Sequence, residues 1–425
     1  MKKTILAATI ALTSVLGVQA ATLHTPDKAF LEAASAVGIT QQNWDHGVLA
    51  RTTMINAYRF TPHVELKTGD YSHDLGKASG LELSKLSGHD IDGEYPLDVI
   101  IRDRLNTDAL VILKDGKLVD EYYWNGMDKD RTHLMMSITK SFTSMTLSQL
   151  VAEGKVDMNA LITDYLPELK ASPGFARATV QEVADMRSGI KIDFTPGMLW
   201  DERMTHVQEW YGKNQYPELE SVLDFGATLN KRLDTEAGIT YDYQCANTEM
   251  LGMIVQRVTG KSLAENMEAR IWKKVGFENN AYLQSNSNGE AVGSGGLNAV
   301  PRDVAKMMDV LVNGGKNRAG EQIIAPEFIN NLLEGNEEVR IAWANGSESK
   351  MAKDAWYKDQ IRTFNIKGHK FLAFVGIHGQ VTIGEPSTGI VLHFNGSQPE
   401  HQAKRTVAMT FLDVVPTLLS AAAQQ

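Results

Sequence analysis

Strand-like sequence occurs near both ends of the main part of this chain, and mostly helical sequence separates the two groups. Two short strand-like runs, 109–114 and 117–124, flank Asp115-Gly116, which is a strong two-residue hairpin signal. Three more such runs occur late in the chain, at 371–376, 381–383 and 389–394. We therefore expect an α/β (α+β) fold whose antiparallel sheet, flanked by helices, contains strands from both chain ends and carries an inserted, mostly helical region at about 157–295.

Local end signals predict the helices around this sheet. Ser262 and Glu265 form a capping box that opens a helix ending near Gly276. A second helix, 301–313, has proline at its first position and ends before a pair of glycines. Apolar periodicity predicts three further helices, at 179–186, 251–258 and 404–419.

The first 95 residues contain two segments that precede the main domain. Residues 1–20 combine Lys2-Lys3, an apolar run too short to span a membrane and a small-residue ending, which together indicate a secretory signal peptide. Cleavage after Ala20 would place the mature protein in the periplasm or outside the cell. Residues 21–95 form a polar, irregular leader that we expect to wrap around the main body through two aromatic anchors, Trp44 and Tyr58.

Charge and composition argue against several classes of partner. The formal charge is -10, and loss of Lys2 and Lys3 takes it to -12, with no block of basic residues that would bind nucleic acid or an anionic membrane. The residue directly after the cleavage site is not a cysteine that could carry a lipid, and no later run is long enough to cross a bilayer. We therefore expect no membrane anchor. The single cysteine, Cys245, excludes an intrachain disulfide, and the eleven histidines are scattered. We expect no metal and no cofactor, and the sequence does not indicate an oligomeric state.

The pattern Ser-x-x-Lys occurs three times, and only one copy opens a predicted amphipathic helix. That copy is Ser137/Lys140, at the start of a helix that runs to about Glu153. Because residues three apart share a helix face, Lys140 could take the proton of Ser137 near the positive end of the helix dipole. Ser137 is therefore either an activated nucleophile or only a helix cap. Of the other two copies, Ser188/Lys191 lies at a predicted helix exit and Ser347/Lys350 lies in a polar loop.

Two later segments could complete such a site. Tyr243, within Tyr-Asp-Tyr-Gln-Cys-Ala-Asn, could carry protons between nucleophile and leaving group, although a buried aromatic residue explains it equally well. A late strand ends in Gly376-Ile377-His378-Gly379. A free N–H group next to Gly376 could form an oxyanion hole with the N–H of Ser137, whereas the plainer interpretation is a strand that ends in a glycine turn.

In this order, Ser-x-x-Lys, Tyr-x-Cys and a late glycine-bearing strand resemble the serine β-lactamase-like hydrolases. That superfamily includes class C β-lactamases, penicillin-binding DD-peptidases, related esterases and 6-aminohexanoate-dimer (nylon-oligomer) hydrolases. The resemblance covers about 105 to 415, so we assign 96–425 to a domain of this type. Several flanking segments strengthen it: Ser137–Ser144, Glu153–Asp157, Tyr165–Glu168, Met186–Ile190 and Gly295–Leu297.

The resemblance implies a role for each matching residue. Ser137 would be the acylated nucleophile, Lys140 its general base, and Tyr243 a helper in proton transfer, although the resemblance leaves open which of Lys140 and Tyr243 is the base. The N–H groups of Ser137 and Ile377 would form the oxyanion hole. Three further residues would line the substrate site: Cys245, Gly376 and His378. For His378 a satisfied histidine at the edge of the cleft is the plainer interpretation. The Gly-Ile-His-Gly-Gln segment is most similar to the nylon-oligomer hydrolase branch, which has an aromatic residue where this chain has histidine.

Departures from the family pattern bear on the substrate. The late strand carries Phe374-Val375-Gly376 where class C β-lactamases carry Lys-Thr-Gly, so that strand lacks the cation for a β-lactam or peptide carboxylate. Our leading hypothesis is an exported serine hydrolase that cleaves a small-molecule amide or ester. A β-lactamase or DD-carboxypeptidase is the second hypothesis. The third, a non-catalytic peptidoglycan- or ligand-binding relative, is disfavoured by the joint presence of Ser137, Lys140 and Tyr243.

Overall fold

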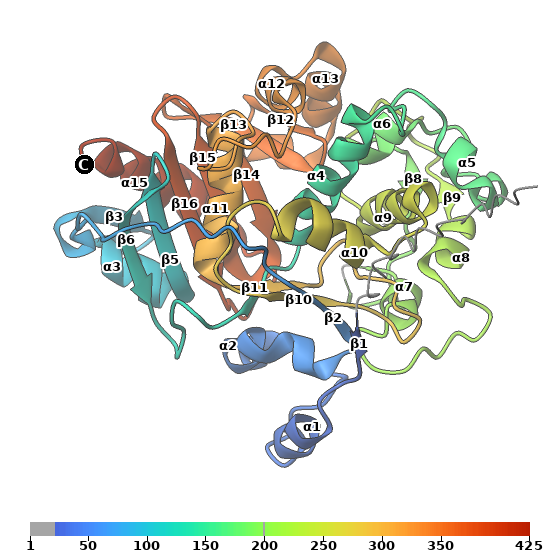
Figure 1. The fold of residues 1–425 in the computed structure, drawn as a ribbon, viewed down its shortest axis with the longest axis horizontal. Coiled ribbons are helices and arrows are strands. Elements are labelled where there is room, and N and C mark those ends of the chain that lie inside the picture. Colours follow the sequence, from blue (N-terminus) through green and yellow to red (C-terminus); the bar gives the residue numbers. More distant parts are fainter. Residues whose placement is uncertain (1–21, 199) are drawn as a thin grey trace, which may run out of the picture.

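The structure, a computed structural model, describes residues 22–198 and 200–425 and is built around two antiparallel sheets (Figure 1). The predicted signal peptide and its cleavage site lie outside the described residues. The larger sheet has seven strands in the order β12-β13-β14-β15-β16-β5-β6. The smaller sheet has five strands in the order β1-β2-β10-β11-β7.

The seven-stranded sheet joins the two ends of the chain. Strands β5 (Thr107–Lys114) and β6 (Lys117–Tyr123) form the predicted hairpin, and β16 (Ile390–Gly396) pairs with β5. In Figure 1 the teal N-terminal strands accordingly lie beside the red C-terminal ones. This pairing confirms the expected sheet. The other strands are β12 (Ala355–Lys358), β13 (Ile361–Ile366), β14 (His369–Gly376) and β15 (Gln380–Glu385), of which β12 and β13 were not predicted.

Alternate residues of these strands enter two separate cores. On β5, Val111 and Leu113 face the core that contains α11 (Pro301–Val312) and the helical region. Leu110 and Ile112 face the opposite core, which contains the C-terminal helices. The sheet is therefore buried on both faces, and helix α11 confirms the predicted helix at 301–313.

The C-terminal helix covers one face of the sheet. It comprises α14 (Lys404–Met409), a π-helical turn (Thr410–Val414) and α15 (Val415–Ala422), which extend the helix predicted at 404–419. Contrary to the sequence expectation, this stretch is long and apolar enough to cross a membrane. However, Leu418 and Leu419 are fully buried in the core that it shares with the sheet. Packing therefore accounts for its apolar character.

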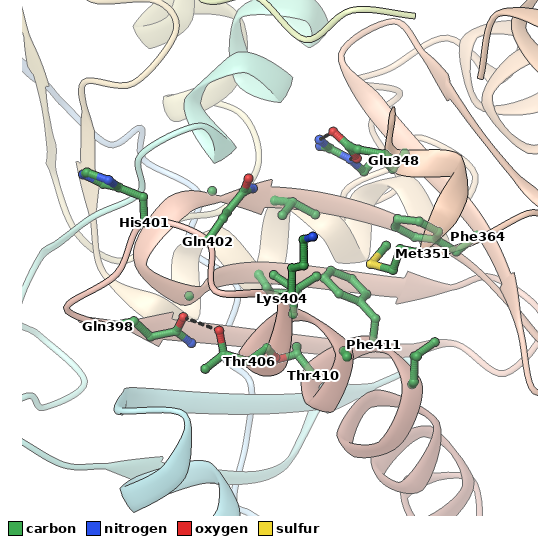
Figure 2. A pocket seen from close by; sticks show the side chains of 18 of the residues that line it. Glu348, Met351, Phe364, Gln398, His401, Gln402, Lys404, Thr406, Thr410 and Phe411 are labelled. Carbon is green, nitrogen blue, oxygen red and sulfur yellow. Dashed lines mark hydrogen bonds and ion pairs between the residues drawn. The ribbon is translucent and has the colours of Figure 1, made fainter. Parts of the chain in front are cut away.

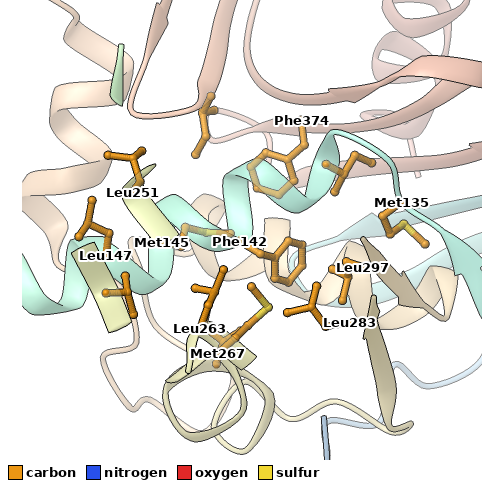
Figure 3. Close-up of a cluster of buried hydrophobic side chains, with 14 of the residues drawn as sticks. Met135, Phe142, Met145, Leu147, Leu251, Leu263, Met267, Leu283, Leu297 and Phe374 are labelled. Atoms are coloured by element: carbon orange, nitrogen blue, oxygen red, sulfur yellow. The ribbon is translucent and has the colours of Figure 1, made fainter. Parts of the chain in front are cut away.

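Helix α4 (Ile138–Ala152) runs through the middle of the molecule, against α9 (Cys245–Thr259) (Figure 3). We expected one apolar stripe, but the helix is buried on nearly every side. Its apolar residues Phe142 and Met145 lie in the core. Its hydroxyl groups bond internally: Thr143 Oγ1, for example, donates to the carbonyl of Gly293 over 2.8 Å. Neighbouring elements therefore hold the start of α4 from all sides.

Short helices make up the rest of the inserted region. The predicted capping box Ser262/Glu265 forms before α10, and two more start α6 (Thr179/Glu182) and α8 (Ser221/Asp224). The helix expected from Ser262 to Gly276 is divided into α10 and a π-helical turn, Glu268–Trp272. The short elements of the region are α5 (Ile162–Tyr165), α6 (Val180–Ala184), α7 (Glu202–Val207), α8 (Val222–Ala227), α10 (Leu263–Met267), β8 (Ile190–Lys191) and β9 (Asn230–Lys231). Two unpredicted helices follow it, α12 (Pro326–Glu334) and α13 (Glu337–Asn345).

The leader is more regular than its composition suggests. Strands β1 (Leu23–His24) and β2 (His63–Leu66) add to the smaller sheet, beside β10 (Ala281–Gln284). As expected, Trp44 is fully buried and Tyr58 stacks on Tyr282 with ring centres 4.0 Å apart. The remaining elements of this sheet and of the N-terminal part are β7 (His133–Leu134), β11 (Leu297–Ala299), α1 (Lys28–Ser35), α2 (Ala50–Thr53), α3 (Leu97–Val99), β3 (Ser87–Asp90) and β4 (Gly93–Pro96).

Candidate active site

Ser137 lies at the first turn of α4, and its side chain does not cap the helix. No backbone N–H of the first turn donates to its hydroxyl group. Instead the Oγ atom accepts a hydrogen bond from Lys140 Nζ over 2.9 Å. The preceding residue, Met136, has a left-handed backbone with φ of 46°, a conformation that non-glycine residues adopt at strained turns. These observations count against the interpretation of Ser137 as only a helix cap.

Lys140 is almost completely buried and has few partners. Besides Ser137 Oγ, its Nζ atom donates to the backbone carbonyl of Ser294 over 2.7 Å. The same atom lies 5.0 Å from the centre of the Tyr243 ring. Cys245, the first residue of α9, is close enough to interact with the ammonium group. The structure thus brings together four of the residues that the sequence singled out.

Two opposing effects act on the pKa of Lys140. Burial disfavours its charged form, but interactions with the Cys245 and Tyr243 side chains outweigh burial and hold the pKa of Lys140 above its usual range. This direction favours an ammonium group that donates to Ser137 in the resting protein.

The end of β14 lies against the start of α4. A Cβ atom built on Gly376 would lie 2.8 Å from the carbonyl oxygen of Met135 and 3.0 Å from the backbone nitrogen of Ser137. Strand β13 pairs with β14 only as far as Ala373, so the last residues of β14 lack a strand partner on that side. A substrate can lie along this edge, and the N–H groups of Ser137 and Ile377 are adjacent to the point of contact.

A cavity of about 640 Å³ adjoins this strand end (Figure 2). Val375 and Gly376 line it on one side, and the start of α14 lines it on the other. Lys404 points into the cavity in Figure 2, and its ammonium group has no ion pair among the described residues. The cavity has an apolar floor formed by Met351, Phe364, Val381 and Phe411.

The position on β14 where class C β-lactamases carry a lysine holds an apolar residue here. Phe374 occupies that place and packs against Phe142 of α4, with ring centres 6.4 Å apart. Arg362 on β13 lies near the site, with its guanidinium carbon 5.0 Å from the Tyr243 ring centre. Both oxygens of Glu348 accept hydrogen bonds from this guanidinium over 2.8 Å. Arg362 is therefore already paired and is poorly suited to a substrate carboxylate.

His378 does not lie where the sequence interpretation placed it. Its backbone is left-handed, with φ of 62°, and its side chain is fully buried. Its Nδ1 atom lies 2.6 Å from the carbonyl oxygen of Gln398, and its ring packs edge-on against His401. Burial lowers the pKa of His378 to about 4. Burial therefore argues against the predicted contact of His378 with substrate and favours the alternative, a histidine held within the protein, because its backbone turns the ring inward.

The other two copies of Ser-x-x-Lys do not resemble the first. Ser188 Oγ donates to Asn247 Oδ1 over 2.6 Å, whereas the exposed Lys191 pairs with Asp193. Ser347–Lys350 forms an exposed 3-10 helix at the rim of the cavity. In neither copy does the lysine bond to the serine.

Sequence analysis did not identify Arg362 or Glu249, which lie behind the two proposed proton carriers. Arg362 lies on a strand that was not predicted. Glu249 follows Cys245 by one helical turn of α9. A carboxylate among the apolar residues of that helix could have indicated from sequence that it is buried near the site.

The amino-acid sequence matches one protein family over most of its length. The family described as Beta-lactamase matches residues 97–410. The chain belongs to the Beta-lactamase family. A 6-aminohexanoate-dimer hydrolase from Paenarthrobacter ureafaciens is 28% identical over 298 residues, which cover 69% of this chain and 73% of that protein. Membership confirms the predicted superfamily and the expectation of a serine hydrolase.

Solved structures agree on the fold of this Beta-lactamase family member. A putative 6-aminohexanoate-dimer hydrolase from Bacillus anthracis superposes with a TM-score of 0.80 at 24% identity, covering 95% of this chain and 100% of that one. A family VIII carboxylesterase gives a TM-score of 0.56 at 16% identity, covering 76% and 95%. The predicted β-lactamase/transpeptidase-like fold is thus confirmed.

Proposed function

We propose that this protein hydrolyses an amide or ester of a small molecule through an acyl-enzyme on Ser137. The hydrogen bond from buried Lys140 to Ser137 Oγ, at the point where β14 meets α4, is the observation that carries the proposal. Nothing in a purely binding protein requires a serine held in this way.

The reaction follows from these positions. Ser137 Oγ attacks the substrate carbonyl carbon and its proton passes to the Lys140–Tyr243 pair, while the N–H groups of Ser137 and Ile377 stabilise the oxyanion. The C–N or C–O bond breaks, and the pair returns the proton to the departing amine or alcohol. Water then attacks the acyl-enzyme and gives its proton to the same pair, which passes it to Ser137 Oγ as the acyl–oxygen bond breaks and the acid is released.

The base is best described as the pair rather than as Lys140 alone. The raised pKa of Lys140, which results from its neighbours despite burial, disfavours a neutral amine next to Ser137. An ammonium at Lys140 cannot take the serine proton by itself, which is why we include the neighbouring Tyr243 in the pair. The sequence analysis named Lys140 as the base and left open whether Lys140 or Tyr243 fills that role, and the direction of this shift argues against Lys140 acting alone.

Amides and esters are favoured over β-lactams and muropeptides for one structural reason. Phe374 takes the place of the cation on β14 and Arg362 is already paired with Glu348, so neither residue can bind a substrate carboxylate there. Similar proteins include the 6-aminohexanoate-dimer hydrolase and a D-stereospecific amidohydrolase from Streptomyces with a TM-score of 0.50 at 18% identity. A β-lactamase or DD-carboxypeptidase remains the alternative.

Intact-mass measurement with a fluorophosphonate tests the proposal. The wild type should gain the mass of one adduct, and Ser137→Ala should gain none. A folded wild type without adduct would instead support a non-catalytic binding protein. Hydrolysis of p-nitrophenyl esters and of the linear 6-aminohexanoate dimer, compared with nitrocefin, would then separate the two enzymatic alternatives.

We also propose that the protein is exported and cleaved after Ala20. The charged start, the short apolar run and the small-residue ending of residues 1–20 support this. Sequencing the N-terminus of the protein from a periplasmic or culture-medium fraction should begin at Ala21. A cytoplasmic protein that keeps Met1 would contradict export.

A further inference from the structure

Glu249 is a buried carboxylate that lies behind Lys140. It is 3% exposed and accepts three hydrogen bonds. Its Oε1 atom accepts from the backbone N–H of Ser294 over 2.9 Å and from Gln208 Nε2 over 2.8 Å. Its Oε2 atom accepts from the backbone N–H of Gly293 over 3.2 Å. Every polar contact of this carboxylate is thus made inside the protein.

The segment that Glu249 holds is the one that receives Lys140. Ser294 donates its N–H to Glu249 and offers its carbonyl to Lys140 Nζ, which in turn donates to Ser137 Oγ. Thr143 of α4 bonds the carbonyl of Gly293 from the other side. A continuous chain of hydrogen bonds therefore runs from the carboxylate to the nucleophile.

We propose that Glu249 is a positioning residue for this site. It fixes the Gly293–Ser294 segment, which fixes the acceptor of Lys140, and its negative charge holds the Lys140 ammonium beside Ser137. This inference rests on the proposed function of Ser137. Because Glu249 touches neither substrate nor reacting atoms, it acts only through Lys140.

Three side chains that could affect the charge of Glu249 lie around it. Lys140 faces it from α4, Gln208 is a neutral donor from the segment after α7, and Cys245 precedes it by one turn on α9. Burial raises the pKa of Glu249 to about 6, although Ser294 and the Lys140 charge act in the opposite direction. Glu249 therefore takes up a proton, and loses its charge, as pH falls through about 6.

The rate of fluorophosphonate labelling as a function of pH tests this role. In the wild type we expect the rate to fall below about pH 6, the value raised by burial of Glu249. Glu249→Gln keeps the shape but not the charge, and it should label roughly 10- to 100-fold more slowly, as other supporting residues do. The step in its profile near that pH should disappear.

A matched variant controls for the loss of any buried glutamate. Glu290 is also partly buried, and it accepts from Asn286 Nδ2 over 3.0 Å, but it has no contact with Lys140. Glu290→Gln should keep the rate and the pH profile of the wild type. If Glu249→Gln does so as well, Glu249 is only a buried core residue and the proposal is wrong.

Two further outcomes keep the test decisive. If Glu249→Gln does not fold, Glu249→Asp retains the charge and should keep the step near pH 6 at a reduced rate. A wild type that labels equally fast at pH 5 and pH 7 would overturn the role of Glu249 without any variant. A wild type that does not label at any pH would overturn the proposed function itself.

Discussion

The α-carbon of Gly376 faces the backbone nitrogen of Ser137 so closely that a Cβ atom there would lie 3.0 Å from that nitrogen. Gly376→Ala should therefore push β14 away from α4 and separate the two proposed oxyanion donors, the N–H groups of Ser137 and Ile377. We expect the labelling rate at Ser137 to fall by roughly 100-fold or more, as when an oxyanion donor is removed. Circular dichroism should show an intact fold.

Gly295→Ala is the control for this prediction. An added Cβ at Gly295 would meet no atom within 4 Å, so its rate should stay close to that of the wild type. If Gly376→Ala labels as fast as Gly295→Ala, the end of β14 does not form part of the site.

The ion pair between Arg362 and Glu348 predicts a stability effect. Arg362 is 5% exposed, so Glu348→Gln would leave a buried positive charge without its partner. We expect a loss of roughly 3 kcal/mol in the free energy of unfolding in urea. The double variant Arg362→Met/Glu348→Gln should recover much of that loss. Glu32→Gln, at an exposed position, should change little, and an equal loss there would contradict the argument.

Buried His378 should make the protein less stable in acid. Burial lowers its folded-state pKa to about 4, whereas the unfolded chain binds a proton near the ordinary value of 6.5. The unfolded state thus binds more protons between these values, so stability is lost as pH falls through that window, by about 2 kcal/mol between pH 7.5 and pH 5. Asparagine tolerates the left-handed backbone, and His378→Asn should show a flatter dependence of unfolding free energy on pH. His89→Asn, at an exposed site, should keep the wild-type slope.

Trp44 should attach the leader to the rest of the protein. Its ring is fully buried, stacks on Phe60 with centres 5.4 Å apart, and donates from Nε1 to the carbonyl of Trp210 over 3.1 Å. Trp44→Ala should cost about 3–5 kcal/mol and expose the leader to limited proteolysis. Val37→Ala, at a leader residue that is 73% exposed, should do neither. Equal protease resistance in both variants would show that Trp44 is not the anchor.

Elements with local signals were predictable from sequence, and elements held by distant contacts were not. Helix α11 was found because Pro301 starts it and glycines end it. The β12–β13 hairpin was missed because its turn, Asp359-Gln360, has left-handed backbones without glycine. Contacts from elsewhere hold that turn: Ser141 Oγ and Thr248 Oγ1 both donate to Gln360. The residues next to Asp359 and Gln360 in the sequence therefore do not predict this turn.

The same distinction applies to the site. Ser137, Lys140 and Tyr243 belong to short motifs, and the structure brings them together. The burial of His378 depends on a single left-handed residue, and the place of Glu249 depends on a segment more than forty positions away in the sequence. Both become visible only when α9, β14 and the Gly293–Ser294 segment are assembled.

The pairing of β16 with β5 has a consequence for the order in which the protein becomes active during synthesis. The ribosome makes Ser137 and Lys140 early, but Gly376 and Ile377 only near the end. If Ser137 is the nucleophile as proposed, a growing chain, or one cut short before β14, carries it without the strand that would complete the oxyanion hole. On that proposal the protein gains activity only after its last strands have been made, and their late position delays it.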